Sequence, residues 1–174
     1  MAHHRNAAPP PEGLHTISAV VEDRAGVLAR VAGLFARRGY NIASLSVNHT
    51  HQENISRMTI RVRAGSHTVL EQIVKQLYKL IDVVKVYDHV DDDVVERELA
   101  LIKVSCTAHN RPEIMQICTV FRATIVDVCE TSVIVEVTGR GDKIEALLRL
   151  LAPFGVTETA RTGCVILARG PAET

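Results

Sequence analysis

The sequence predicts an α+β protein built from two successive units, each with the element order βαββαβ. Segments whose apolar residues alternate, which is typical of half-buried strands, recur between segments whose apolar residues follow helical spacing. The same order of segments occurs twice, once on each side of an acidic run at residues 91–93. Each half spans roughly 75 residues, a size that suits a four-stranded antiparallel sheet with helices on one face.

The first unit is expected over residues 14–90, and each of its elements follows from local spacing. Alternating apolar residues predict four strands, over residues 17–21, 43–47, 58–62 and 83–87. Apolar residues at helical spacing predict two helices, over residues 27–35 and 69–77. Gly39 stands where the first helix is expected to stop, and Ser66 is a candidate cap for the second. A polar turn over residues 49–54 is expected to join the second and third strands.

The second unit is expected over residues 97–170, after an acidic linker at residues 91–96. The same patterns predict strands over residues 99–106, 124–129, 133–137 and 156–168. They predict helices over residues 114–121 and 144–151. Pro153 is expected to end the second helix, and a turn or bulge near Gly163 to interrupt the last strand. The prediction for the whole chain is therefore two ferredoxin-like sandwiches.

Residues 1–13 differ in composition from both predicted units. They contain three consecutive prolines among small and polar residues. Such a segment cannot bury enough apolar surface to offset the entropy of ordering it. We therefore expect a flexible tail before the first unit.

The charge balance argues against nucleic acid and against an anionic membrane as partners. Twenty basic and twenty acidic side chains cancel, and the isoelectric point is about 7.1. Both of those partners select a basic surface. Aromatic residues make up only 3% of the chain and tryptophan is absent, so a base-stacking platform is not expected.

The sequence also points to a cytoplasmic protein. Every apolar run is far shorter than the roughly 18 residues that cross a bilayer, and the chain does not open with a signal peptide. The four cysteines are scattered through the second half without a C-x-x-C pair. We expect reduced thiols that pack as small apolar side chains.

A search for catalytic and metal-binding motifs is largely negative. The sequence contains no G-x-S-x-G, H-E-x-x-H or phosphate-binding glycine motif. His49 and His51 are two candidate metal ligands at a turn, but no third ligand is evident beside them. The acidic run at residues 91–93 is interpreted as a solvated linker. The prediction is a chain without catalytic residues and without a metal of its own.

The segment Asp23-Arg24-Ala25-Gly26-Val27-Leu28 has a physical interpretation as a binding loop. It lies where the first strand gives way to the first helix, where the first N–H groups of a helix lack partners within it. These groups attract a small carboxylate. Gly26 would permit close approach, and Asp23 offers a negative charge to an ammonium group. The alternative is structural: Asp23 caps the helix and Gly26 eases the turn.

Longer stretches resemble a known family. The stretch VVEDRAGVLARVAGLFARRGYNIASLSV resembles the ACT domain, an amino-acid-sensing module of metabolic enzymes. Within and after it, RRGYNIASL, SRMTI and LEQIVKQLYKLIDVVKV are similar to the regulatory (small) subunit of acetolactate synthase. In the second half, ERELALIKV, FRATIVDV and LLRLLAPFGVTETARTG resemble the C-terminal domain of that family in order and spacing. The resemblance covers about residues 14–170.

The resemblance implies a regulatory role. Members of the family bind the catalytic large subunit, raise its activity and make it sensitive to feedback inhibition by valine or another branched-chain amino acid. Thiamine diphosphate, magnesium and FAD belong to the catalytic partner, so no cofactor is expected on this chain. The family also implies a homodimer, with the effector bound between two N-terminal domains.

Carried over by position, the resemblance implies a set of effector-binding residues. They are Asp23, Ala25, Gly26, Val27, Leu28, Asn41 and Ile42. Backbone N–H groups at Gly26 and Val27 would hold the carboxylate. Asp23, with main-chain oxygens near Asn41 and Ile42, would hold the ammonium. Many bacterial members have asparagine where this chain has Asp23.

Two other functions are open from the sequence. One is a stand-alone amino-acid-sensing protein that regulates a different client. Against it, residues 107–112 of the second half lack the D-x-x-G-x-L pattern of the first. The other is a small enzyme that uses His109 or Cys118.

Overall fold

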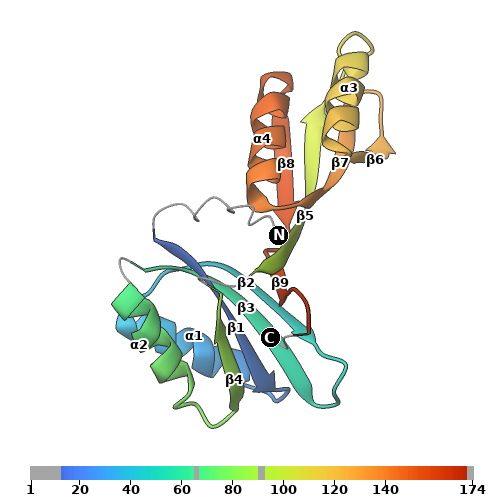
Figure 1. Ribbon diagram of the computed structural model, residues 1–174. Helices are drawn as coiled ribbons and strands as arrows, with labels where there is room; N and C mark the ends of the chain where they lie inside the picture. The colour runs from blue at the N-terminus through green and yellow to red at the C-terminus, as the bar shows by residue number, and fades with distance from the viewer. Residues whose placement is uncertain (1–12, 65–66, 90–92, 172–174) are drawn as a thin grey trace, which may run out of the picture. The chain divides into compact units, whose positions relative to one another are not determined.

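A computed structural model of the chain describes residues 13–64, 67–89 and 93–171. The chain divides into two units (Figure 1). The N-terminal unit contains the described residues up to Val94 and those from Ala168 onward, and the C-terminal unit runs from Val95 to Leu167. Residues 1–12 of the predicted tail, Ser66 and residues 91–92 of the predicted linker lie outside the described residues.

The N-terminal unit has the predicted order of elements. They are β1 (Leu14–Glu22), α1 (Val27–Arg38), β2 (Ile42–His49), β3 (Ile55–Arg63), α2 (His67–Leu77) and β4 (Val83–Asp88). The strands form one antiparallel sheet in the order β2-β3-β1-β4. Both helices lie on one face of this sheet (Figure 1). β2 is therefore an edge strand, and it runs in the same direction as β1.

The core of this unit lies between the helices and the sheet. Alternate residues of β1 and β3 face it, and they meet the apolar stripes of α1 and α2. Its fully buried members include Ile17, Phe35, Ile60, Leu70 and Ile73. Burying side chains of this size contributes about 1.5–3 kcal/mol each, which is the main stabilisation available to a unit this small.

The register of β2 differs from the predicted alternation of Ala43, Leu45 and Val47. The pairing with β3 shifts between Ile42 and Ser44, which is a β-bulge. As a result Ile42 and Leu45 both pack against the core, and Ala43 between them is exposed. Val47 keeps the predicted alternation with Leu45, since it lies opposite the core residue Met58, and it is 37% exposed near the end of the strand. The extra residue of a bulge reverses the side-chain alternation after it, and spacing alone does not reveal this.

The C-terminal unit repeats the arrangement with one more strand. Its elements are β5 (Val94–Ser105), α3 (Arg111–Phe121), β6 (Thr124–Val128), β7 (Ser132–Gly139), α4 (Gly141–Leu151), η1 (Ala152–Phe154), β8 (Val156–Arg161) and β9 (Val165–Ala168). The strand order is β6-β7-β5-β8, and β9 also pairs with β5. A second core of buried side chains, including Ile102, Ile114 and Leu147, lies between this sheet and its helices.

The predicted last strand is two strands, and the strand before it begins earlier than expected. Gly163 adopts a φ of 76° between β8 and β9, which confirms an interruption at that point. β5 begins at Val94, so the last three residues of the predicted linker 91–96 lie in a strand. The partner strand β9 explains this extension, because it supplies hydrogen bonds to the first part of β5.

One ionic network ties three elements of the C-terminal unit together. Arg161 at the end of β8 donates hydrogen bonds to both carboxylate oxygens of Glu98 on β5, at 2.7 and 2.9 Å. It also donates to Glu145 on α4. The hydrogen bonds to Glu98 are the main cause that raises the pKa of Arg161 above its ordinary value, so this guanidinium stays charged.

Two glycines of α1 give a paired stability prediction. Gly33 lies inside the helix, and a Cβ there would be 3.5 Å from Arg37 Nη1, an ordinary contact. We expect Gly33→Ala to raise the free energy of unfolding by about 0.5–1 kcal/mol. Gly39 ends the helix with a φ of 70°, and its N–H donates to the carbonyl of Ala36. Gly39→Ala should lower the free energy of unfolding by about 1–2 kcal/mol, because an L-residue is strained there.

Urea unfolding of the two variants, followed by circular dichroism, tests this pair. The added methyl group is the same in both, so burial alone predicts shifts of the same sign. Shifts of opposite sign are the expected result. A stabilising Gly39→Ala would contradict the assigned left-handed conformation.

No helix in the described part of the chain combines the length and apolar character needed to span a membrane.

Candidate functional site

The loop between β1 and α1 leaves helix N–H groups exposed. Gly26 precedes the helix with φ 88° and ψ −7°, a left-handed conformation that favours glycine. Among the described residues, nothing accepts a hydrogen bond from the N–H groups of Gly26, Leu28 and Ala29. The N–H of Val27, which the family resemblance assigns to the ligand carboxylate together with that of Gly26, already donates to the carbonyl of Arg24 at 3.3 Å. Three donors at the positive end of the helix dipole therefore have no partner among the described residues.

Asp23 does not cap this helix, so the structural alternative for it is wrong. Its carboxylate Oδ2 lies 3.1 Å from Nδ1 of His49, at the far end of β2. Its backbone N–H donates to the carbonyl of Asn54 at 2.7 Å, which fixes the loop against the turn between β2 and β3. Both side chains are exposed, so the Asp23 carboxylate is accessible to another cation.

The side chains of the loop differ in what they can contact. Val27 is 3% exposed and belongs to the core of the unit, which leaves only its backbone at the surface. Leu28 is 45% exposed and faces outward beside the free N–H groups. Ala25 and Gly26 are also exposed. Within one chain, Leu28 is therefore the apolar side chain available to a ligand on this loop.

The sheet separates Asn41 and Ile42 from the loop. Ile42 is opposite Val62 on β3, which in turn is opposite His15 at the start of β1. Asp23 follows the other end of β1. At about 3.3 Å per residue, the length of β1 places more than 20 Å between the two groups. One chain does not bring the predicted site residues together. The carbonyl of Asn41 accepts a hydrogen bond from the N–H of Arg63.

Arg30 lies beside this loop and was not among the residues that the sequence suggested. Its Nε donates to Oδ2 of Asp82 at 2.7 Å, and Asp82 is 5% exposed. The Nη1 atom of Arg30 would lie 3.3 Å from a Cβ built on Gly26. The spacing between Gly26 and Arg30 could have suggested this residue, because the side chain of the fourth residue of a helix points back over the first turn.

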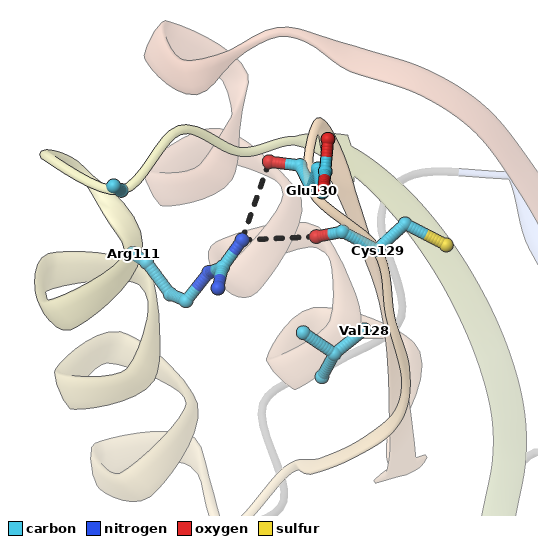
Figure 2. A pocket seen from close by; sticks show the side chains of 5 residues that line it. Arg111, Val128, Cys129 and Glu130 are labelled. Atoms are coloured by element: carbon cyan, nitrogen blue, oxygen red, sulfur yellow. Dashed lines mark hydrogen bonds between the residues drawn. The ribbon is translucent and has the colours of Figure 1, made fainter.

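The corresponding loop of the C-terminal unit has different chemistry. An open groove of about 630 Å³ is lined by Ala108, Arg111, Val128, Cys129 and Glu130 (Figure 2). Arg111 donates to the carbonyls of Cys129 and Glu130 at 2.9 and 3.3 Å, and its Nε donates to the sulfur of Cys106. Arg111 therefore links α3 to the turn between β6 and β7 of its own unit, and these hydrogen bonds stabilise the fold.

The other candidate residues of the sequence are not assembled into a site. His49 contacts Asp23, and no group of three potential metal ligands occurs in residues 13–64, 67–89 and 93–171. Cys118 lies in the core, and burial raises the pKa of its thiol, which keeps it in the unreactive protonated form. His109 is exposed on the loop before α3.

Family comparisons cover both units. Residues 97–170 match the family model described as the small subunit of acetolactate synthase. Residues 17–85 match the model described as an AHAS small subunit-like ACT domain. The two matches fall on the two units of the fold, and they agree with the resemblance found in the sequence.

Individual proteins give the same result. The chain is 54% identical to the acetolactate synthase small subunit of Mycobacterium bovis, over 90% of this chain and 93% of that protein. It is 49% identical to the small subunit of Bacillus subtilis, over 88% and 90% of the two chains.

A solved structure confirms the predicted fold class. The crystal structure of the acetolactate synthase small subunit from Thermotoga maritima matches with a TM-score of 0.83 and 42% identity. The match covers 91% of this chain and 99% of that one. Together with the two family models and the identity over nearly its whole length, this shows that the chain belongs to the acetolactate synthase small subunit family.

Proposed function

We propose that this chain is the regulatory subunit of acetolactate synthase, which binds and activates the catalytic subunit and makes it sensitive to feedback inhibition by valine. In this role it contributes no catalytic residue. Thiamine diphosphate, magnesium and FAD are assigned to the catalytic partner. Family membership supports the partner, and the loop at residues 23–28 supports the effector.

The observation that carries the proposal is the chemistry of that loop. Exposed N–H groups at Gly26 and Leu28 are suited to a carboxylate, and the Asp23 carboxylate is suited to an ammonium group. A free amino acid carries both charges on one carbon. The exposed Leu28 side chain beside them favours an amino acid with an apolar side chain.

The topology supports a site shared by two copies. β2 is an edge strand whose outer hydrogen-bonding groups are not used within the sheet. If two β2 strands pair antiparallel, the end of one lies beside the start of the other. His49 and Asp23 of one copy then approach Asn41 and Ile42 of the second. This pairing would complete a site that one chain holds in two separate parts.

Inhibition then follows from linkage. Valine that joins two copies favours one arrangement of the regulatory dimer over others, and only this difference in affinity can alter the catalytic subunit. Coupling of about 1–3 kcal/mol would change activity about 5- to 150-fold. The proposal therefore predicts partial inhibition, whose extent depends on this difference in affinity within the complex. Valine would act at a site remote from the reacting groups of the catalytic subunit.

The direct test is acetolactate formation by the cognate catalytic subunit, with and without this chain, across a valine titration. We expect activation by the chain and inhibition by valine only when the chain is present. Activation without inhibition would keep the partner and exclude valine as effector. An absence of both effects would favour the alternative function, an ACT protein that senses amino acids for another client.

A further inference from the structure

We propose that Arg30 is a specificity-determining residue of the effector site, where its guanidinium recognises the carboxylate of the bound amino acid. The inference rests on the effector site proposed above, and it adds a side chain to a set that otherwise holds the carboxylate only by backbone groups. It follows from the position, the anchoring and the charge environment of Arg30.

The position of Arg30 places its guanidinium beside Gly26 in the loop at residues 23–28. Arg30 lies one turn after Gly26 on α1, and helical side chains point back toward the N-terminus. Its Nη1 atom is 3.3 Å from the point where a Cβ of Gly26 would lie. The guanidinium therefore borders the space that the missing side chain leaves open. The first turn of α1, with its free N–H groups, follows Gly26 directly in the chain.

Asp82 holds the guanidinium in this position through one edge. The hydrogen bond from Nε to Oδ2 measures 2.7 Å, and Asp82 is itself fixed because its carbonyl accepts the N–H of Glu22 at 2.9 Å. The side chain of Arg30 is 46% exposed. Among the described residues, nothing accepts a hydrogen bond from its two terminal nitrogens. Arg30 is thus preorganised, with free donors that match a carboxylate.

The charged side chains around the loop lie on two sides of it. Asp82 and Arg30 lie on the side of β4, whereas Asp23 faces His49 on the side of β2. Between them, Arg24 and Glu22 pair at 3.2 Å and neutralise one another. The loop therefore presents a cation toward α1 and an anion toward the β2 edge. This arrangement fits an α-amino acid that has both charges free, and it disfavours a derivative without the carboxylate.

The test compares valine with valinamide, which keeps the ammonium and the side chain but has a neutral amide in place of the carboxylate. Titration calorimetry of the full chain gives the dissociation constant of each and their ratio. The variant is Arg30→Gln with Asp82→Asn, which avoids leaving a buried carboxylate without its partner. We expect the preference for valine over valinamide to fall about 10- to 100-fold in this variant, because a charge-assisted hydrogen bond is lost.

Matched variants separate recognition from net charge and from folding. The double variant leaves the net charge of the chain unchanged, because it removes one positive and one negative charge. Arg37→Gln removes an arginine from the far end of α1, and we expect it to leave the ratio unchanged. Arg30→Lys keeps a cation with the Asp82 partner, and we expect it to retain a preference for valine between those of the wild type and the double variant. Circular dichroism of each variant verifies that it is folded.

Each outcome bears on a separate claim. Two results would show that Arg30 does not recognise the carboxylate. One is that the double variant prefers valine over valinamide as strongly as the wild type does. The other is that it loses affinity for valine and for valinamide by the same factor. If the wild-type chain binds valine and valinamide equally, carboxylate recognition by this loop is excluded altogether. If it binds neither, the proposed effector function is wrong, and the role of Arg30 falls with it.

Discussion

Replacing Gly26 with aspartate is expected to abolish valine inhibition of the complex between this chain and the catalytic subunit. The new carboxylate would lie within the first turn of α1, beside the N–H groups proposed to hold the carboxylate of valine. It would occupy that position and repel a second negative charge. We expect the valine concentration for half-inhibition to rise at least about 100-fold, since both a charge repulsion and a lost hydrogen-bond site act together.

The control for this variant is Gly26→Asn. Asparagine has nearly the shape of aspartate and accepts the left-handed conformation that Gly26 requires at φ 88°. It carries no charge. We expect Gly26→Asn to reduce valine sensitivity less than Gly26→Asp. The activation of the catalytic subunit, measured on the same samples without valine, reports whether the complex has formed. Persistent inhibition of the aspartate variant would mean that the effector binds elsewhere.

Arg161→Ala is expected to cause a large loss of stability in the C-terminal unit. Glu98 is only 5% exposed, and both of its carboxylate oxygens accept hydrogen bonds from Arg161. Removing the guanidinium leaves a buried carboxylate without its partner. The expected decrease in the free energy of unfolding is about 3 kcal/mol. Urea unfolding of the full chain, followed by circular dichroism, measures it.

A double variant identifies the cause of that loss. Arg161→Met with Glu98→Leu removes both charges and keeps apolar volume, which is often neutral or stabilising at buried ion pairs. We expect it to recover most of the stability lost in Arg161→Ala. If both variants are equally unstable, the unpaired Glu98 carboxylate is not the cause of the loss. If Arg161→Ala unfolds at the same urea concentration as the wild type, the network contributes little.

Most of the fold follows from local sequence, because strands and helices differ in the spacing of their apolar residues over a few turns. The strand at Ile17, the helix stop at Gly39 and the interruption at Gly163 are all signals of this kind. The bulge after Ile42 is not, because it depends on how β2 meets β3. The early start of β5 likewise depends on a strand that comes about seventy residues later.

The candidate site, like the fold, is predicted only in part from local sequence. The position of residues 23–28 between a strand and a helix predicts the binding loop, and this position is a local property of the sequence. The partners that define its charges are distant in sequence: Arg30 pairs with a residue 52 positions away, and Asp23 with His49. The assignment of Asn41 and Ile42 came from family resemblance alone, and the sheet places them away from the loop in one chain.

The last described residues have a consequence for how the protein is made. Residues from Ala168 onward belong to the N-terminal unit, where Arg169 donates its backbone N–H to the carbonyl of Asp93 and forms an ion pair with it at 3.1 Å. Along the sequence, the C-terminal unit therefore lies between two segments of the N-terminal one. During translation, strands β1 to β4 of the N-terminal unit are synthesised first, and the segment that begins at Ala168 follows only after the whole C-terminal unit. A fragment that stops at Val94 omits that segment.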